Sequence, residues 1–181
     1  LTYEPGHVIL FTRWTMVSAH LSIIPEFEDK IALLGLADDF DVTATAIRNR
    51  RTGSRILFHG IKTSSGNQTA RLKSIKGVTT WVLDEAEELV DPRTFDTIDL
   101  SIRAVDLPNR VVLVLNPASK THFLYERFAR EPRADTLYIH TTWLDNRHNL
   151  SPSWIAQAER MRETNPARYA HIFLGEWTTE S

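Results

Sequence analysis

Three continuous apolar runs, separated by segments with helical spacing, constrain the fold of this chain more than any other feature. The runs occur at residues 7–13, 78–83 and 110–115, and polar residues end or follow each of them. Strands buried on both faces read as continuous apolar runs, and they occur in parallel sheets covered by helices. The 181 residues are therefore predicted to form one α/β domain, a mainly parallel sheet flanked by helices.

The remaining pattern adds a β-hairpin and a fourth strand. Two β-prone runs flank RNRRTGS within residues 40–61, and Gly53 can adopt a positive φ there, so a hairpin insertion is predicted. Residues 135–142 predict another strand, and 62–74 a polar loop. Helices are predicted at 14–36 with a break at Pro25, and at 91–105, 121–130, 151–163 and 165–176.

Composition limits the function classes. The chain has no cysteine, which excludes a disulfide framework and thiolate metal sites. Its net charge of −2 means that contact with a polyanion must be local, and no apolar run is long enough to cross a bilayer. Arg48, Arg50 and Arg51 at the hairpin tip are the local candidates for contact with DNA phosphates, and a solvated turn is the alternative.

Acidic residues follow the run at 78–83 directly. Asp84 and Glu85 come at its end, and Asn116 follows the run at 110–115. Ligands of open α/β sheets bind beyond the carboxyl ends of the strands. One carboxylate there can hold Mg²⁺ through water while its neighbour activates a water molecule, as nucleoside triphosphate hydrolysis requires. The alternative is that these acids only favour the start of a following helix.

A nucleotide site also needs a phosphate cradle, with the pattern G-x-x-x-x-G-K-[ST]. Gly60 and Gly66 bracket five residues, but Asn67 follows where the pattern needs lysine. If the chain belongs to an ATPase, this loop is expected upstream of Leu1.

Three stretches together resemble the large terminase subunit of tailed phages and prophages, the motor that pumps double-stranded DNA into a procapsid. They are residues 56–89, 111–128 and 141–177, of which TTWLDN at 141–146 is the most specific. The resemblance implies a P-loop NTPase fold of the additional-strand, catalytic-glutamate type that uses ATP and Mg²⁺. It also implies a homo-oligomeric ring that works with a portal protein and a small terminase subunit in the host bacterial cytoplasm.

The resemblance also implies roles for particular residues. WVLDEAEE matches the Walker B motif, with Asp84 as the Mg²⁺ residue and Glu85 as the catalytic glutamate. LNPAS matches the segment that couples hydrolysis to movement, with Asn116 as the γ-phosphate sensor. Arg71 and Lys73 lie where some members present a basic residue to the nucleotide of a neighbouring subunit.

The chain departs from the family pattern in two respects. The Walker A segment and the C-terminal nuclease domain are both absent from these residues. In the family sheet, the strand before the P-loop lies between the strand that carries LNP and the one that here is 135–142. Its absence is expected to leave a gap in the sheet that exposes Val112, Val114 and Leu137.

Three other readings remain open at this point. Residues 84–87 have the shape of a DEAx helicase motif, although the next strand ends in LNPAS where those enzymes usually carry Ser-Ala-Thr. A two-metal nuclease could use Asp84, Glu85 and Glu88, but such sites draw carboxylates from separate elements. The third reading is a non-enzymatic fragment.

Overall fold

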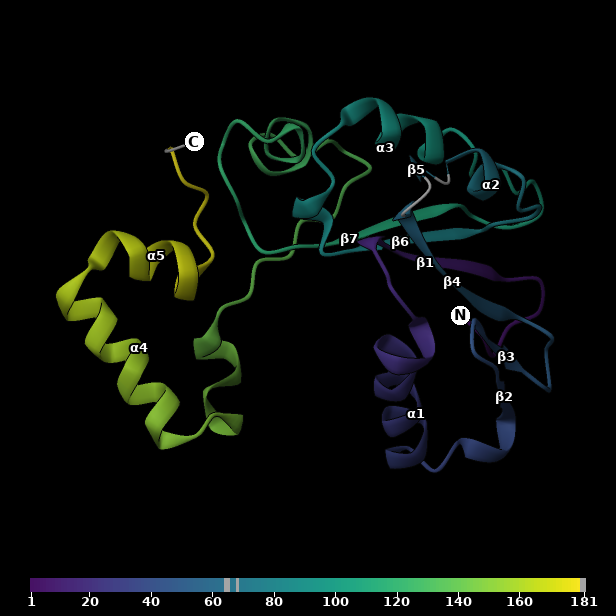
Figure 1. Cartoon of the computed structure of the whole chain (residues 1–181), viewed down its shortest axis with the longest axis horizontal. Helices are drawn as coiled ribbons and strands as arrows, with labels where there is room; N and C mark the ends of the chain where they lie inside the picture. Colours follow the sequence, from purple (N-terminus) through teal and green to yellow (C-terminus); the bar gives the residue numbers. More distant parts are fainter. Residues whose placement is uncertain (64–65, 68, 180–181) are drawn as a thin grey trace. The chain divides into compact units, whose positions relative to one another are not determined.

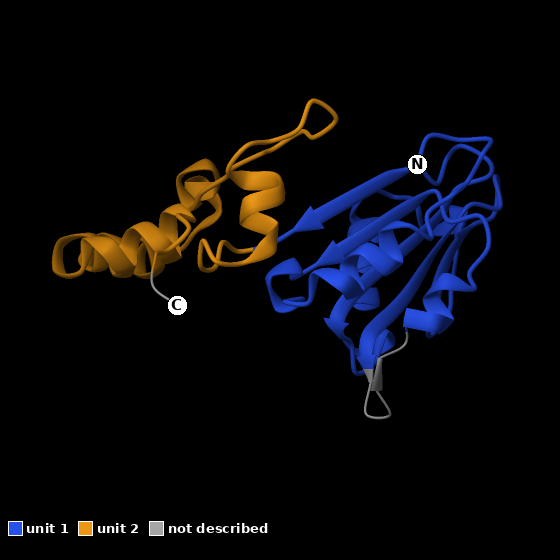
Figure 2. Cartoon of the chain, turned by 90° about the horizontal axis from the view of Figure 1, so that it is seen from above, with its two compact units in different colours: residues 1–115 blue, residues 116–181 orange. Residues whose placement is uncertain are grey.

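The computed structural model of the chain describes residues 1–63, 66–67 and 69–179. The chain divides into two compact units, Leu1–Leu115 and Asn116–Ser181 (Figure 2). The first unit contains the sheet, and the second is mainly helical.

The sheet of unit 1 has the order β2-β3-β4-β1-β6-β7, with β5 paired to β4. Its strands are β1 (Val8–Thr15), β2 (Phe40–Val42), β3 (Ala46–Asn49), β4 (Arg55–Thr63), β5 (Gly66–Asn67), β6 (Thr80–Asp84) and β7 (Arg110–Val114). The strands β4, β1, β6 and β7 are parallel to one another, whereas β2, β3 and β5 pair antiparallel to their neighbours. The predicted α/β class and its mainly parallel core are confirmed.

The predicted hairpin is formed by β3 and β4. Gly53 has φ 77°, and its N–H donates to the carbonyl of Asn49 at 2.9 Å, while the Asn49 N–H donates to the carbonyl of Ser54 at 2.8 Å. A glycine is favoured at this position because a Cβ is strained at positive φ. The antiparallel strands β3 and β2 thereby extend the sheet beyond β4.

Helices cover both faces of the sheet (Figure 1). They are α1 (Ile23–Leu33), α2 (Thr69–Lys73) and α3 (Pro92–Asp99), with short 3₁₀ turns at Ala19–Leu21, Ala37–Asp39 and Ala86–Glu88. In Figure 1, α1 lies on one side of the sheet and α2 and α3 lie on the other.

The helix predicted at 14–36 is shorter in the structure. β1 extends to Thr15, which pairs with Lys62, so the helix cannot begin at residue 14. The predicted break at Pro25 is wrong, because Pro25 lies in the first turn of α1, where an N–H has no partner within the helix. The loop predicted at 62–74 is also wrong in part: α2 forms there, anchored by Leu72, which is 1% exposed.

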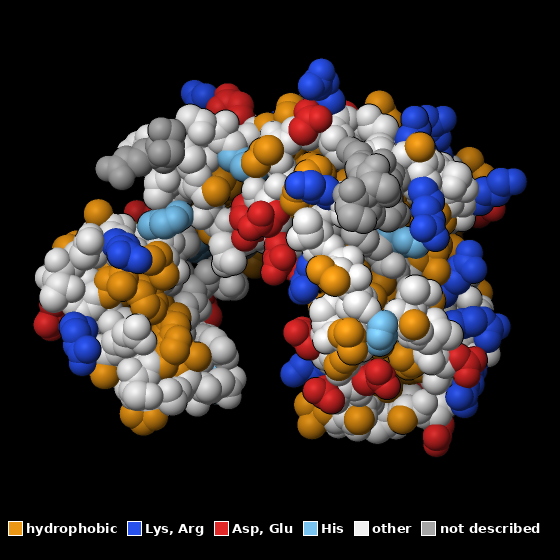
Figure 3. Space-filling view, viewed as in Figure 1, with side chains coloured by type: hydrophobic (Ala, Val, Ile, Leu, Met, Phe, Trp, Pro, Cys, Tyr) orange, Lys and Arg blue, Asp and Glu red, His pale blue; other side chains and the backbone are white. Residues whose placement is uncertain are grey.

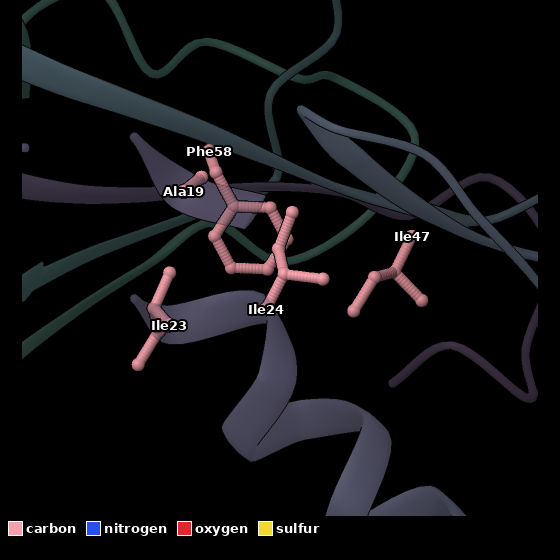
Figure 4. Packing of buried hydrophobic residues seen from close by; sticks show 5 residues of the cluster. All are labelled: Ala19, Ile23, Ile24, Ile47 and Phe58. Atoms are coloured by element: carbon pink, nitrogen blue, oxygen red, sulfur yellow. The ribbon is translucent and has the colours of Figure 1, made fainter. Parts of the chain in front are cut away.

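Aromatic side chains pack on each face of the sheet. Phe11 and Phe58 lie 5.5 Å apart between ring centroids, and Phe27 of α1 packs against both. Figure 4 shows Ile23 and Ile24 of α1 beside Phe58 in the same cluster. On the other face, Trp81 of β6 packs on Phe95 of α3 at 5.0 Å. Both faces of β1 and β6 are therefore covered, as their apolar sequences predict.

Unit 2 has its own small core. Its elements are a π-helical turn (Tyr125–Ala129), a 3₁₀ helix (Trp143–Asn149), α4 (Pro152–Thr164) and α5 (Pro166–Leu174). Trp143, Ala158 and Tyr169 are buried together, and the indole N–H of Trp143 donates to the Tyr169 hydroxyl at 3.1 Å. Side chains of Ser151 and Asn165 cap the last two helices, so both predicted helices are confirmed.

The strand predicted at 135–142 is wrong. No strand of the described chain pairs with it, and Leu137 and Ile139 are 83% and 73% exposed. Alternating apolar residues favour a strand only when a neighbour completes its hydrogen bonds. β7 is the last strand of the described sheet, and its residues Val112 and Val114 are 41% and 51% exposed, as expected for an open edge. None of the helices in the described chain is long and apolar enough to span a membrane.

Candidate active site

Asp84 is the last residue of β6 and is held there by an arginine of β1. Thr12 of β1 pairs with Leu83 of β6, so the next residues, Arg13 and Asp84, are neighbours across the two strands. The Arg13 Nε–H donates to the Asp84 Oδ2 atom at 2.8 Å, and the Nη2 atom of the same guanidinium forms an ion pair with Oδ2 at 2.7 Å. The two side chains are 21% and 19% exposed, so this charge pair is largely shielded from solvent.

Thr12 fixes the same part of β6 from the other face of the sheet. The indole N–H of Trp81 donates to Thr12 Oγ1 at 2.8 Å, and that hydroxyl donates to the carbonyl of Val82 at 3.0 Å. Thr12 and Trp81 are both 0% exposed. Successive residues of β1 therefore hold the end of β6 on both faces.

The chain turns sharply after Asp84. Glu85 has φ 52° and ψ 45°, and it is the only residue other than glycine with a positive φ in the described ranges. A side chain in this left-handed region costs on the order of 1–3 kcal/mol, and such residues cluster at active sites. The Glu85 side chain is exposed, whereas Ala86 and Leu89 are 0% exposed and anchor the turn below it.

The end of β6 suits a cation that is bound mainly by the phosphates of a nucleotide and by few protein side chains. No group of three or more His, Asp or Glu side chains that could hold a metal occurs among the described residues. Mg²⁺ is usually bound through one or two carboxylates together with the phosphates of a nucleotide. Within the described chain, Asp84 takes Arg13 on Oδ2 and no hydrogen bond on Oδ1, so its arrangement fits Mg²⁺ brought by a nucleotide.

Asn116 follows β7 by two residues. Val114 of β7 pairs with Asp84 in the register of the sheet. Asn116 is exposed and begins unit 2. Its role in this site stays a prediction from the sequence.

Arg71 and Lys73 lie on α2. Both side chains are exposed. Burial lowers the pKa of His59 on β4, and the positive charge of Arg71 lowers it further. Lys73 lines a shallow pocket of about 330 Å³ together with Arg93 and Asp91 at the start of α3. Neither basic residue contacts Asp84 in the described chain, and their predicted role stays a prediction.

The hairpin arginines are bound to aspartates of their own unit. The Arg50 Nε atom lies 2.7 Å from Asp41 Oδ1, and the Arg48 Nη1 atom lies 3.7 Å from Asp41 Oδ2. The Arg51 Nη2 atom lies 2.8 Å from Asp39 Oδ1. In Figure 3, Lys and Arg side chains are interspersed with acidic and uncharged ones. These pairs give the arginines a structural role beside any contact with DNA.

Arg13 is the site residue that the sequence interpretation passed over. The sequence did contain an indication of it, because Arg13 is the polar residue at the end of the run at 7–13, just as Asp84 is the polar residue directly after the run at 78–83. Its partner could not be read from the sequence, since the pairing depends on β1 lying beside β6 in this register.

The sequence of this chain matches a family of known proteins along almost its whole length. The family model described as phage terminase large subunit matches residues 1–176. The large terminase subunit of Bacillus phage SPP1 is 24% identical over 167 residues, which cover 86% of this chain and 38% of that protein. The chain therefore spans less than half the length of this relative.

Solved structures share the fold. The large terminase of a thermophilic bacteriophage has a TM-score of 0.72 at 17% identity, covering 98% of this chain and 42% of that one. The same terminase in complex with ADP has a TM-score of 0.68 at 16% identity, with 98% and 42% covered. The large terminase ATPase domain of Thermus phage P74-26 has a TM-score of 0.61 at 13% identity, with 97% and 78% covered. Because the family model covers nearly every residue, this chain belongs to the phage terminase large subunit family.

Proposed function

We propose that these residues form part of the ATPase motor of a terminase large subunit, which drives double-stranded DNA into procapsids. The observation that carries the proposal is the end of β6, where Asp84 is held by Arg13 and Glu85 adopts a strained backbone at the carboxyl edge of parallel strands. Family membership supports it, and so does the ADP complex of the thermophilic phage terminase, which shares this fold.

Each residue of the site has a distinct task in this proposal. Asp84 would hold Mg²⁺ through water by its Oδ1 atom, and the ion would neutralise charge on the phosphates. Glu85 is exposed beside it and would orient the attacking water and accept its proton. Asn116 would sense the γ-phosphate, and Arg71 or Lys73 would reach the nucleotide of a neighbouring subunit.

The nucleotide's phosphates need a cradle that these residues do not encode. No G-x-x-x-x-G-K-[ST] pattern occurs in the 181 residues, and backbone N–H groups of such a loop bind the phosphates. We place this loop on a strand that would pair with the open edge of β7. The complete protein would also carry the nuclease domain.

The partners follow from the same proposal. They are double-stranded DNA, a portal protein and a small terminase subunit, met by a ring of identical subunits in the cytoplasm of the host bacterium. Arg48, Arg50 and Arg51 are proposed as a local contact with DNA. Their ion pairs with Asp39 and Asp41 would weaken this contact, because the aspartates compete with the DNA phosphates.

Two enzymatic alternatives have less support. A DEAx helicase would share the β6 end, but the matching family is that of terminases over residues 1–176. A two-metal nuclease at this position needs carboxylates that converge from separate elements, and the described residues contain no such group of three.

The test is Glu85→Gln in a full-length protein that contains these residues. We expect steady-state ATP hydrolysis to fall by at least about 100-fold, because the water loses its base, while nucleotide affinity measured by calorimetry stays unchanged. Glu88→Gln is the matched control, since Glu88 is an exposed acid three residues further on, and it should retain turnover. Undiminished hydrolysis in Glu85→Gln would rule out the assignment.

A further inference from the structure

We propose that Arg13 is a positioning residue that holds the Asp84 carboxylate in the orientation needed for a divalent cation carried by a nucleotide. The inference rests on the proposed function, and it assigns a task to a residue outside the Walker B segment. Arg13 acts through Asp84 and needs no contact with the nucleotide.

The geometry of the pair leaves one carboxylate oxygen available. The Nε and Nη2 atoms of Arg13 both lie against Oδ2 of Asp84, at 2.8 Å with a hydrogen bond from Nε and at 2.7 Å in an ion pair with Nη2. Rotation of the carboxylate would break the hydrogen bond from Nε and the ion pair with Nη2, so holding Oδ2 sets the direction of Oδ1 as well. Arg13 therefore orients the oxygen atom that would face the cation.

The arginine of this pair is more protected than the arginines of the β3–β4 hairpin. The Arg13 side chain is 21% exposed, whereas the side chains of the hairpin arginines are 53–70% exposed. Exposed pairs are weakened by solvent and by side-chain motion. A shielded pair that loses one member leaves the other charge without compensation, so Asp84 depends on Arg13 more than a surface acid would.

The backbone that carries Arg13 lies in the interior of the sheet. β1 lies between β4 and β6 in the sheet, and the buried Thr12 hydroxyl links it to Trp81 and Val82. The guanidinium is therefore presented from a central strand rather than from a loop. Residues that orient a metal ligand in this way typically change metal affinity by about 10–100-fold when they are replaced.

The experiment compares ADP affinity with and without Mg²⁺ in a full-length protein that contains these residues. Calorimetric titrations are made with excess Mg²⁺ and with EDTA, and the ratio of the two affinities is the readout. Arg13→Gln is expected to reduce this ratio by about 10-fold, and Arg13→Lys, which keeps the charge and one donor, is expected to retain part of it. Affinity in EDTA should stay at the wild-type value, which also shows that the variants are folded.

A double-mutant cycle tests whether Arg13 affects the Mg²⁺ enhancement of ADP affinity through Asp84 or independently of it. Asp84→Asn should lose the Mg²⁺ enhancement, and adding Arg13→Gln to it should produce no further loss if Arg13 acts through Asp84. Arg130→Gln is the matched control, since Arg130 pairs with Glu126 at 2.9 Å on the surface of unit 2, and it should leave the ratio unchanged.

Two results would overturn the inference, and they are distinguishable. If Asp84→Asn loses the enhancement but both Arg13 variants keep it fully, Arg13 does not position the carboxylate, and the proposed function stands. If the wild-type protein shows no Mg²⁺-dependent gain in ADP affinity, the proposed function fails and the inference fails with it.

Discussion

Individual residues at the end of β6 carry backbone strain and charge, which lower the stability of the fold unless neighbouring residues compensate for them. Glu85 has a left-handed backbone, a conformation that glycine would adopt without strain. Retaining a carboxylate there at a cost in stability is consistent with a chemical task for the side chain. The buried residues Ala86 and Leu89 and the bonds made by Thr12 provide the support.

His59 gives a prediction about pH at this scale. Burial, and then the charge of Arg71, lower its pKa in the folded protein below the ordinary 6.5. Below pH 6.5 the unfolded chain therefore binds a proton that the folded chain resists, so the contribution of His59 to stability is lost as pH falls through the folded pKa. Above pH 6.5 that contribution is complete.

The measurement is chemical denaturation of wild type, His59→Asn and Arg71→Gln at pH 5 and pH 7. The loss of stability between pH 7 and pH 5 should be smallest in His59→Asn, and smaller in Arg71→Gln than in wild type. An equal loss in all three proteins would contradict the prediction.

At the scale of elements, predictions from the sequence succeeded where the pattern is local. The apolar runs of β1, β6 and β7, the turn at Gly53 and the caps of α4 and α5 were read correctly, since composition or one side chain decides each of them. The failures depend on partners distant in the sequence. Residues 135–142 have the pattern of a strand but no ladder in the described chain, and α2 forms in a polar segment because Leu72 is buried. The pairing of Arg13 with Asp84 likewise required the strand order.

The β3–β4 hairpin yields a prediction about DNA. If Arg48, Arg50 and Arg51 all contact phosphates, replacing them with alanine should reduce the slope of log affinity against log salt by up to about 3, since each contact contributes about 0.9. Asp39 and Asp41 compete with DNA phosphates for these arginines. The decrease in the slope is therefore expected to be smaller than this upper value. DNA-binding titrations at several salt concentrations measure the slope.

The control for that experiment replaces exposed arginines elsewhere in unit 1. Arg93 and Arg103 are exposed and lie outside the hairpin, so changing both should affect the slope less. An unchanged slope in the triple variant would assign the hairpin arginines a structural role only.

At the scale of the whole molecule, the open edge of the sheet at β7 and the incomplete nucleotide site have one explanation in the proposed function. β7 is the last strand of the described sheet, and the phosphate cradle is missing from the same 181 residues. The proposal accounts for both by one additional strand and loop. Asp84 and Glu85 on β6 would then form a complete nucleotide site only together with that strand and loop.

A binding experiment tests this link. The 181-residue chain alone should bind ATP only weakly and hydrolyse it negligibly, because no loop N–H groups or lysine bind the β- and γ-phosphates. Calorimetry on this chain, beside a full-length protein that contains it, makes the comparison. Micromolar binding by the short chain would show that the nucleotide site lies elsewhere.

The open edge of β7 also gives alternate backbone amides different access to solvent. The Arg110 N–H donates to the carbonyl of Thr79, and in a parallel ladder every second residue donates to the same neighbour. The amides of Val112 and Val114 therefore face β6, whereas those of Val111 and Leu113 face away from it. Deuterium uptake along this single strand should alternate from one residue to the next, and a strand docked on the free side would erase the alternation.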